Sequence, residues 1–167
     1  MQVVLVNPPS PPEFRVSRGL MGGFGMAVHP ELLYPPIELA HVASVLEELG
    51  HEVRLIDADA EELDLVGTRD AVLKCEPALV CLDSSSTSLD RDLALAREIR
   101  EQSSAPVAIL GSQVTYTPGE IFEANAVDLV VRGEPEYTLR DVAQRVAGGE
   151  PLEGTHAPIT AILPTVE

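Results

Sequence analysis

Polar residues and glycines follow directly after several short apolar segments of this chain. Asp83-Ser84-Ser85-Ser86-Thr87-Ser88 brings a run of hydroxyl groups next to apolar residues, and hydroxyls can hydrogen-bond a polar ligand. Gly111-Ser112-Gln113 ends a later apolar segment, and a glycine at such a point lets a ligand approach the backbone closely. Arg132-Gly133-Glu134-Pro135-Glu136 follows the last of these segments. These residue types favour binding of a bulky polar ligand.

Each of these polar segments also has a simpler interpretation. Thr87 and Asp90 could cap a following helix, which would leave Ser84 to Ser86 as solvated turn residues. The glycine at position 111 could serve only a tight turn. The carboxylates of the last segment suit the N-terminus of a helix without any ligand. Their place in the fold has to decide between these interpretations.

The sequence lacks the motifs that are typical of dinucleotide-binding folds, phosphate loops and activated serine nucleophiles. There is no Gly-x-Gly-x-x-Gly after the first apolar segment, no Gly-x-x-x-x-Gly-Lys-Ser/Thr and no Gly-x-Ser-x-Gly. Cys75 and Cys81 form neither a Cys-x-x-Cys pair nor a disulfide framework. Among the histidines, His41 and His51 flank a predicted helix and are interpreted as surface residues, which leaves His29 as the one candidate metal ligand. Catalysis by the chain alone is not expected.

The chain of 167 residues carries 27 acidic and 11 basic side chains, which gives a formal net charge of −16. This charge repels the phosphates of nucleic acids and anionic membrane surfaces, so neither is an expected partner. Hydrophobic residues make up 45%, enough for one domain with its own core. No stretch approaches 18 uninterrupted apolar residues, and no signal-peptide pattern begins the sequence. Together with two unpaired cysteines, these features predict a cytoplasmic protein.

Five short apolar segments without clean alternation predict strands that are buried on both faces of a sheet. Segments with helical periodicity lie between them. This order predicts an α/β fold, a doubly wound, Rossmann-like or flavodoxin-like five-stranded parallel sheet with helices on both faces. In such sheets ligands bind beyond the carboxyl ends of the strands, where the polar segments lie. The predicted strands are Gln2–Val6, Val53–Asp57, Ala78–Leu82, Val107–Leu110 and Asp128–Val131.

The helical pattern is more regular in some segments than in others. The pattern from Ile37 to Leu49 is the most regular, and Gly50 is placed to end that helix in a left-handed conformation. Thr117-Pro118-Gly119-Glu120 is typical of a capping box, in which the threonine hydroxyl accepts from an early amide of a short helix. The helix between Asp64 and Cys75 has an uncertain start because Gly67 interrupts its pattern. Two further helices are predicted around Leu89–Ile99 and Leu139–Val146.

Two segments fall outside the alternation of strands and helices. Pro8 to Tyr34 gives 27 residues between the first strand and the first helix, whereas such connections usually take 2 to 6. Four glycines among apolar residues make this loop a surface that could close over a large flat ligand, the alternative being a disordered excursion. After Gly149 the pattern dissolves into prolines and one apolar run, Ile159–Leu163, that could form a short strand.

Three segments stand in an order that is typical of one family. Val3-Val4-Leu5-Val6-Asn7-Pro8-Pro9 comes first, and Tyr34-Pro35-Pro36-Ile37-Glu38-Leu39-Ala40 follows, continuing to Ile56-Asp57-Ala58. Arg132-Gly133-Glu134-Pro135-Glu136-Tyr137-Thr138-Leu139 is similar to an Arg-Gly-Glu-x-Glu-x-Thr-Leu segment. In this order they resemble the cobalamin-binding domain at the N-terminus of B12-dependent radical S-adenosylmethionine (SAM) enzymes. The resemblance covers most of the chain.

The resemblance implies where a cofactor would lie. In that family the corrin sits on the carboxyl edge of the sheet, and the dimethylbenzimidazole tail, detached from cobalt, inserts beside the strands. The Asp-x-His-x-x-Gly motif that gives cobalt a histidine in other B12 proteins is absent, so no histidine ligand is expected. A larger side chain at position 111 is expected to block the tail while leaving the fold stable. The residues expected to contact cobalamin are Asn7, Pro8, Pro9, Ser84, Ser85, Ser86, Thr87, Gly111, Ser112, Gln113, Gly133 and Glu134.

The resemblance also implies a partner. The family's radical domain needs Cys-x-x-x-Cys-x-x-Cys for its [4Fe-4S] cluster, and this sequence lacks that motif. The cluster and SAM would then belong to a radical SAM domain in the same full-length protein or in a separate chain, with an excised N-terminal domain favoured over a free-standing relative. Residues 1–149 would form the cobalamin-binding domain and 150–167 a linker or stub.

Whether the protein belongs to an enzyme stays open at this stage. The resemblance implies a part of a B12-dependent radical SAM methyltransferase or cyclase-type enzyme that is not catalytic alone. The alternative is a cofactor-free, flavodoxin-like regulatory or protein-interaction domain. A small-molecule transferase that uses a nucleotide in the same crevice is a third hypothesis.

Overall fold

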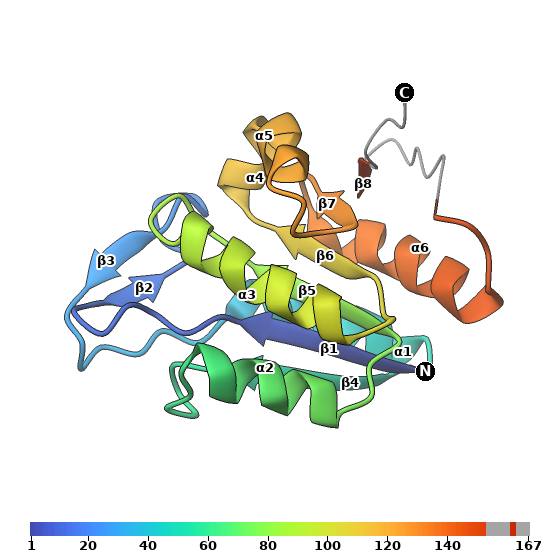
Figure 1. The fold of residues 1–167 in the computed structure, drawn as a ribbon, viewed down its shortest axis with the longest axis horizontal. Helices are drawn as coiled ribbons and strands as arrows, with labels where there is room; N and C mark the ends of the chain where they lie inside the picture. The colour runs from blue at the N-terminus through green and yellow to red at the C-terminus, as the bar shows by residue number, and fades with distance from the viewer. Residues whose placement is uncertain (153–160, 163–167) are drawn as a thin grey trace.

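The computed structural model describes residues 1–152 and 161–162 of the chain. Its centre is a six-stranded sheet with the order β4-β1-β5-β6-β7-β8 (Figure 1). The strands from β4 to β7 run parallel, and β8 pairs antiparallel with β7. The predicted five-stranded parallel sheet is confirmed, with one strand added at its edge. The strands are β1 (Gln2–Asn7), β4 (Glu52–Asp57), β5 (Leu79–Asp83), β6 (Val107–Leu110), β7 (Leu129–Val131) and β8 (Ala161–Ile162).

The added strand β8 lies in the C-terminal segment that the sequence interpreted as a linker or stub. It occupies two residues of the apolar run Ile159–Leu163, and the other residues of this run lie outside the described ones. The same holds for most of the predicted linker, residues 150–167. The described part of the C-terminus therefore adds sheet pairing at the edge next to β7.

Helices cover both faces of the sheet, as the sequence predicted. Figure 1 shows α2 and α3 in front of the sheet and α1 behind it. Side chains of β1 alternate between the two faces, with Val4 and Val6 in one apolar cluster and Val3 and Leu5 in the other. One layer holds α1 (Ile37–Glu48) and α6 (Pro135–Gly148), and the other holds α2 (Leu65–Lys74), α3 (Leu89–Gln102), α4 (Ser112–Tyr116) and α5 (Pro118–Glu123).

Helix ends follow the sequence signals in some places. Gly50 has a φ of 79°, and its amide donates to the carbonyl of Glu47, so it ends α1 in the left-handed conformation that was predicted. The uncertain start of α2 is resolved by Asp64, whose carboxylate accepts from the amide of Gly67 at 2.7 Å. The glycine thus lies in the first turn of α2 and does not interrupt the helix.

Two predicted caps are wrong, because the hydroxyl groups donate to acceptors one helical turn away. Thr117 precedes α5, but its hydroxyl donates to the carbonyl of Gln113 at 3.3 Å and does not accept from an early amide. The residue that precedes α3 is Ser88 rather than Thr87, and its hydroxyl donates to the Asp92 carboxylate at 2.6 Å. Both hydroxyls thus act as donors to residues four positions away in the sequence, and neither caps the helix that follows it.

The long loop after β1 contains a β-hairpin that the sequence did not indicate. Its strands β2 (Arg15–Ser17) and β3 (Met26–Val28) pair antiparallel, with Val16 opposite Ala27. The hairpin is tied to the segment after β4 because Arg15 forms an ion pair of 2.8 Å with Asp59. The two strands have only three residues each, which is too short for a clear period in the sequence.

A buried ion pair fastens this hairpin to the sheet. Nη2 of Arg18 lies 2.7 Å from Oδ1 of Asp92 on α3, and both side chains are almost fully buried. Nη1 of Arg18 donates to Oδ1 of Asn7 and to the carbonyl of Pro8, while Asp92 also accepts from the hydroxyls of Ser84 and Ser88. Burial alone would lower the pKa of Arg18, but the Asp92 carboxylate raises it above its ordinary value. The arginine therefore stays charged inside the fold.

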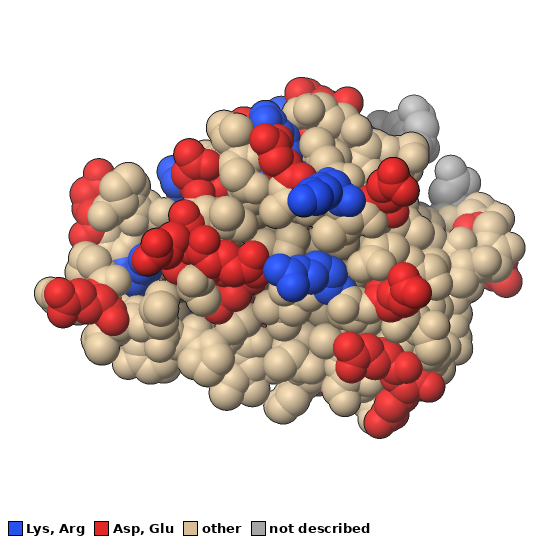
Figure 2. Space-filling view, turned by 90° about the horizontal axis from the view of Figure 1, so that it is seen from below, with Lys and Arg blue, Asp and Glu red and all other residues tan. Residues whose placement is uncertain are grey.

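The surface carries the acidic excess of the composition. Figure 2 shows one face on which acidic side chains outnumber the basic ones. Several arginines are paired with acids, as in the exposed pair of Arg54 and Glu61 at 3.1 Å. Among the helices of the described residues, none combines the length and the apolar character that a membrane crossing requires.

We expect the change Arg18→Met to destabilise the fold by about 3–5 kcal/mol, because it leaves Asp92 as an uncompensated buried charge. The change Arg54→Met removes a pair that is exposed to solvent and should cost less than about 1 kcal/mol. Urea unfolding of both variants, followed by far-UV circular dichroism, measures the difference. Equal losses for the two variants would contradict the structural role of the buried pair.

Candidate functional site

A cavity of about 630 Å³ opens at the carboxyl edge of the sheet. Its floor is formed by residues at or within two positions after the ends of four neighbouring parallel strands, namely Asn7, Asp83, Gly111 and Gly133. Its walls come from the loop around residues 16–23, the start of α1, α4 and the start of α6. Ligand sites in doubly wound sheets occupy this position, and the volume lies within the usual range for small-molecule pockets.

The glycine-rich part of the long loop is fixed against the strand ends. The hydroxyl of Ser112 donates to the carbonyl of Gly22 at 2.6 Å, and the amide and hydroxyl of Ser86 both donate to the carbonyl of Phe24. The Phe24 ring stacks on Tyr116 of α4, with centroids 5.7 Å apart. A side chain at position 23 would overlap the hydroxyl of Ser112, so glycine is required for this close approach.

The structure brings five of the twelve predicted contact residues to the cavity. Pro8 and Pro9 are buried, and their carbonyls accept from Arg18 and Arg91. Ser84 and Ser85 are also buried and direct their hydroxyls to Asp92, Thr87 and Ser88, while Ser86 and Thr87 lie beside the glycine loop. Gln113 lies on α4 but does not line the cavity. The residues that line it are Asn7, Gly111, Ser112, Gly133 and Glu134.

Position 111 does not tolerate the side chain that the sequence analysis allowed there. Gly111 has a φ of 128°, and a Cβ atom would overlap the carbonyl oxygen of Ser84. The expectation that a larger residue would leave the fold stable is therefore wrong. The glycine permits β5 and the turn after β6 to approach each other, in addition to lining the cavity.

Several cavity residues were not singled out from the sequence. His41, which was interpreted as a surface residue, is exposed and also lines the cavity, three residues after Glu38 on α1. Arg18 and Thr115 line it as well. The helical period places Glu38 and His41 on one face of α1, so an examination of its polar face could have found them. Nothing local predicts that Arg18 reaches the cavity.

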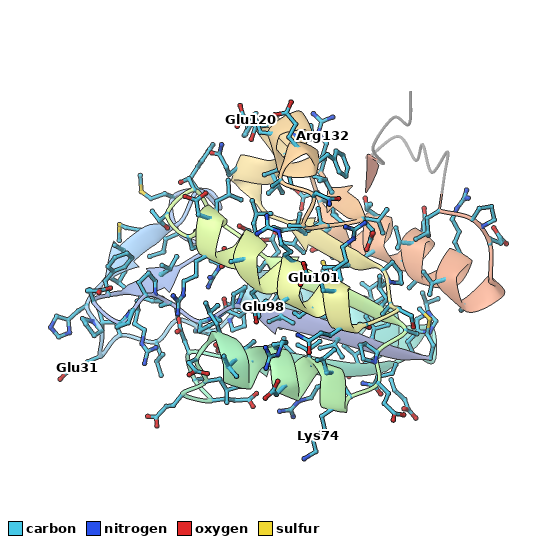
Figure 3. All side chains as sticks on the ribbon, viewed as in Figure 1. Glu31, Lys74, Glu98, Glu101, Glu120 and Arg132 are labelled. Atoms are coloured by element: carbon cyan, nitrogen blue, oxygen red, sulfur yellow. The ribbon has the colours of Figure 1, made fainter. Side chains whose placement is uncertain are left out.

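Carboxyl groups dominate the charge of the cavity. Asp83 and Glu38 line it together with Glu134 and Glu136 of α6. Burial raises the pKa of Glu38, and the nearby Glu136 and Glu134 raise it further, whereas His41 lowers it. The only lysine of the sequence, Lys74, lies at the end of α2 (Figure 3), and it does not line this cavity.

The described residues contain no group of three or more His, Cys, Asp or Glu side chains that could hold a metal ion. His29, the candidate metal ligand of the sequence analysis, is exposed beside the hairpin and does not line the cavity. Its Nδ1 accepts from the amide of Glu31 at 3.4 Å. The cavity thus suits a ligand that brings its own polar groups, in contact with backbone, hydroxyl and carboxyl groups of the protein.

The chain is similar to an uncharacterized methyltransferase, PH0819, of Pyrococcus horikoshii, with 27% identity over 92% of this chain and 31% of that protein. The radical SAM methyltransferase TsrM from Kitasatospora setae, solved with cobalamin and a [4Fe-4S] cluster, superimposes with a TM-score of 0.65 and 23% identity over 92% of this chain and 26% of that one. The cobalamin-dependent SAM radical enzyme OxsB superimposes with a TM-score of 0.69 and 18% identity, over 99% and 22% of the two chains.

The chain spans only 22% to 31% of the length of these relatives, and the two structural matches show a shared fold. The family model for the B12 binding domain matches residues 25–143, which is more than two-thirds of the chain. That region includes the strand ends β5, β6 and β7 and most of the walls of the cavity. The chain belongs to the B12 binding domain family.

Proposed function

We propose that this chain binds cobalamin in the cavity at the carboxyl edge of its sheet and presents it to a radical SAM domain outside these 167 residues. The observation that carries the proposal is the cavity itself. The ends of four parallel strands line it, in a chain that belongs to the B12 binding domain family. The family match favours this function over a cofactor-free regulatory domain, which could have a crevice at the same edge of its sheet.

The residues around the cavity fit a corrinoid. Cobalamin is large and carries many amide, hydroxyl and phosphate groups, so it needs close backbone approach and polar partners. Gly111 and Gly133 expose backbone at two strand ends, and Asn7 and Ser112 line the cavity beside them. The polar groups of Asn7 and Ser112 already bond Arg18 and Gly22, so these two residues shape the cavity there. The exposed rings and aliphatic chains of Tyr34 and Ile37 provide apolar surface at the rim. These six residues would hold the cofactor.

Bound cobalamin supplies a cobalt centre that can carry a methyl group or take part in radical chemistry. The residues of this chain that line the cavity would bind and orient it. SAM and a [4Fe-4S] cluster would be held by the partner domain. PH0819 and TsrM are both described as methyltransferases, which favours methyl transfer over cyclase-type chemistry for the whole enzyme.

We further propose that residues 1–149 form the cofactor domain, with β8 added to the edge of its sheet, and that the rest of 150–167 leads toward the partner domain. The last helix, α6, ends at Gly148, and Gly149 adopts the left-handed conformation that closes a helix. Cys75 and Cys81 are both free thiols, which is consistent with a reducing cytoplasm.

The proposal is tested by titration of the purified chain with hydroxocobalamin, followed by desalting and a visible absorption spectrum. Retention of about one corrinoid per chain is expected. Complete loss of colour at tens of micromolar, with an intact fold by circular dichroism, would favour the cofactor-free alternative.

Two substitutions on α4 distinguish the cavity from the originally predicted contacts. Thr115 lines the cavity, whereas Gln113 lies on the same helix outside it. We expect Thr115→Phe to weaken cobalamin binding at least about tenfold, because the ring fills space that the ligand needs. Gln113→Phe should bind as the unaltered chain does. Equal effects of the two changes in equilibrium dialysis would place the ligand elsewhere.

Cobalt is expected to bind without a histidine ligand. His41 lines the cavity, but none of the described residues hydrogen-bonds its ring, and ligating histidines usually have such an orienting partner. We therefore expect His41→Ala and His29→Ala to leave the absorption spectrum of the bound corrinoid unchanged. A spectral shift in either variant would identify that histidine as a ligand.

A further inference from the structure

Asp83 differs from the other buried aspartates among the described residues. Asp59 accepts from Ser10 and Arg15, and Asp92 accepts from an arginine and two hydroxyls. Asp83 is only 4% exposed, yet no side chain of the described residues hydrogen-bonds its carboxyl group, and the adjacent Ser84 amide donates to the carbonyl of Leu110. Buried carboxyl groups are normally satisfied by several partners.

Asp83 is one of the residues that line the cavity. It ends β5, the central neighbour of β1 and β6, so it lies in the floor between Asn7 and Gly111. A group in this place meets any ligand that fills the cavity. Its missing partners are therefore available for a ligand to supply.

The surrounding charges do not hold Asp83 ionised. Arg18 faces it from the segment after β2, but that arginine is already paired with Asp92 of α3. Glu38 faces it from α1, and the Cys81 thiol lies on its own strand. The pKa of Asp83 is raised to about 7, with burial as the largest cause; Arg18 opposes the shift, and Glu38 and Asp92 add to it. At neutral pH the carboxyl group is thus present in both its acidic and its ionised form.

We propose that Asp83 contacts the bound corrinoid from the floor of the cavity as a neutral carboxylic acid and donates a hydrogen bond to an acceptor oxygen of the ligand. This inference rests on the proposed function, since it names a contact for the same ligand. A neutral acid can donate, whereas the ionised form only accepts. Binding is therefore linked to the uptake of a proton when the solution is at or above neutral pH.

The test is calorimetric titration of the full chain with cyanocobalamin at pH 6 and pH 8. The cyanide ligand removes the aqua–hydroxo titration of cobalt, so the ligand itself does not take up a proton in this range. We expect binding to be about tenfold weaker at pH 8, because one proton must be taken up by a group with a pKa near 7. Repeating the pH 8 titration in buffers of different ionisation enthalpy counts that proton directly.

The variant Asp83→Asn keeps a donor of similar shape that does not titrate. It should bind at pH 6 and pH 8 with the same affinity and without proton uptake. The matched control is Glu136→Gln, which alters another carboxyl group of the cavity and should retain the pH dependence of the unaltered chain. Loss of the dependence in the control, or its persistence in Asp83→Asn, would overturn the assignment to Asp83.

A measurement without ligand separates this inference from the proposed function. An acid whose folded pKa is raised binds more protons in the folded state between its unfolded pKa of 3.8 and about 7, so stability falls as the pH rises through that window. The melting temperature of the unliganded chain should therefore fall less steeply with pH in Asp83→Asn. Binding without proton uptake would overturn the contact alone, whereas absence of any cyanocobalamin binding would overturn the proposed function with it.

Discussion

The buried pair of Arg18 and Asp92 is the constraint on which the carboxyl edge of the sheet depends. A long segment leaves β1, forms a hairpin away from the sheet, and must return to enclose a cavity. The guanidinium group of Arg18 links Asn7 at the end of β1 with Asp92 of α3. The hydroxyls of Ser84 and Ser88 also donate to the Asp92 carboxylate. The hairpin side of the cavity, the start of α3 and the turn after β5 are thereby fixed by one network.

This network explains which parts of the site could be predicted from the sequence. Buried parallel strands show as continuous apolar runs, so the order of strands and the edge at which their ends meet follow from pattern alone. The role of the hydroxyl groups that follow β5 does not follow from pattern. Ser84 and Ser85 carry the residue types of a ligand site, but their hydroxyls point into the protein toward partners such as Asp92 and Ser88. Whether a hydroxyl meets a ligand or a buried carboxylate depends on a contact with Arg18, 74 residues from its partner Asp92.

The same reasoning applies to residues that sequence analysis missed. Apolar periodicity predicts α1 from the side that packs on the sheet, and it predicts that the opposite side faces solvent. Glu38 and His41 lie on that side, where the loop and α6 turn a surface into the wall of a cavity. The glycine-rich loop was recognised as a possible cover, but its hairpin arises from pairing of three-residue strands that carry no clear period. Long-range closure, rather than local propensity, creates these parts of the site.

The acidity of the cavity follows from the same closure. In an open crevice the carboxyl groups of Asp83 and Glu38 would be hydrated, and their mutual repulsion would be weak. Once the hairpin encloses them, burial and neighbouring carboxyl groups raise the pKa of both Asp83 and Glu38. The nearest arginine, Arg18, is already paired with Asp92. A cavity of this kind disfavours an anionic group of the ligand next to its floor. It favours a ligand group that accepts a hydrogen bond there. The ion pair that fixes the loop thereby also leaves Asp83 without a charge partner, so the stability of the edge and the chemistry of its floor have a common origin.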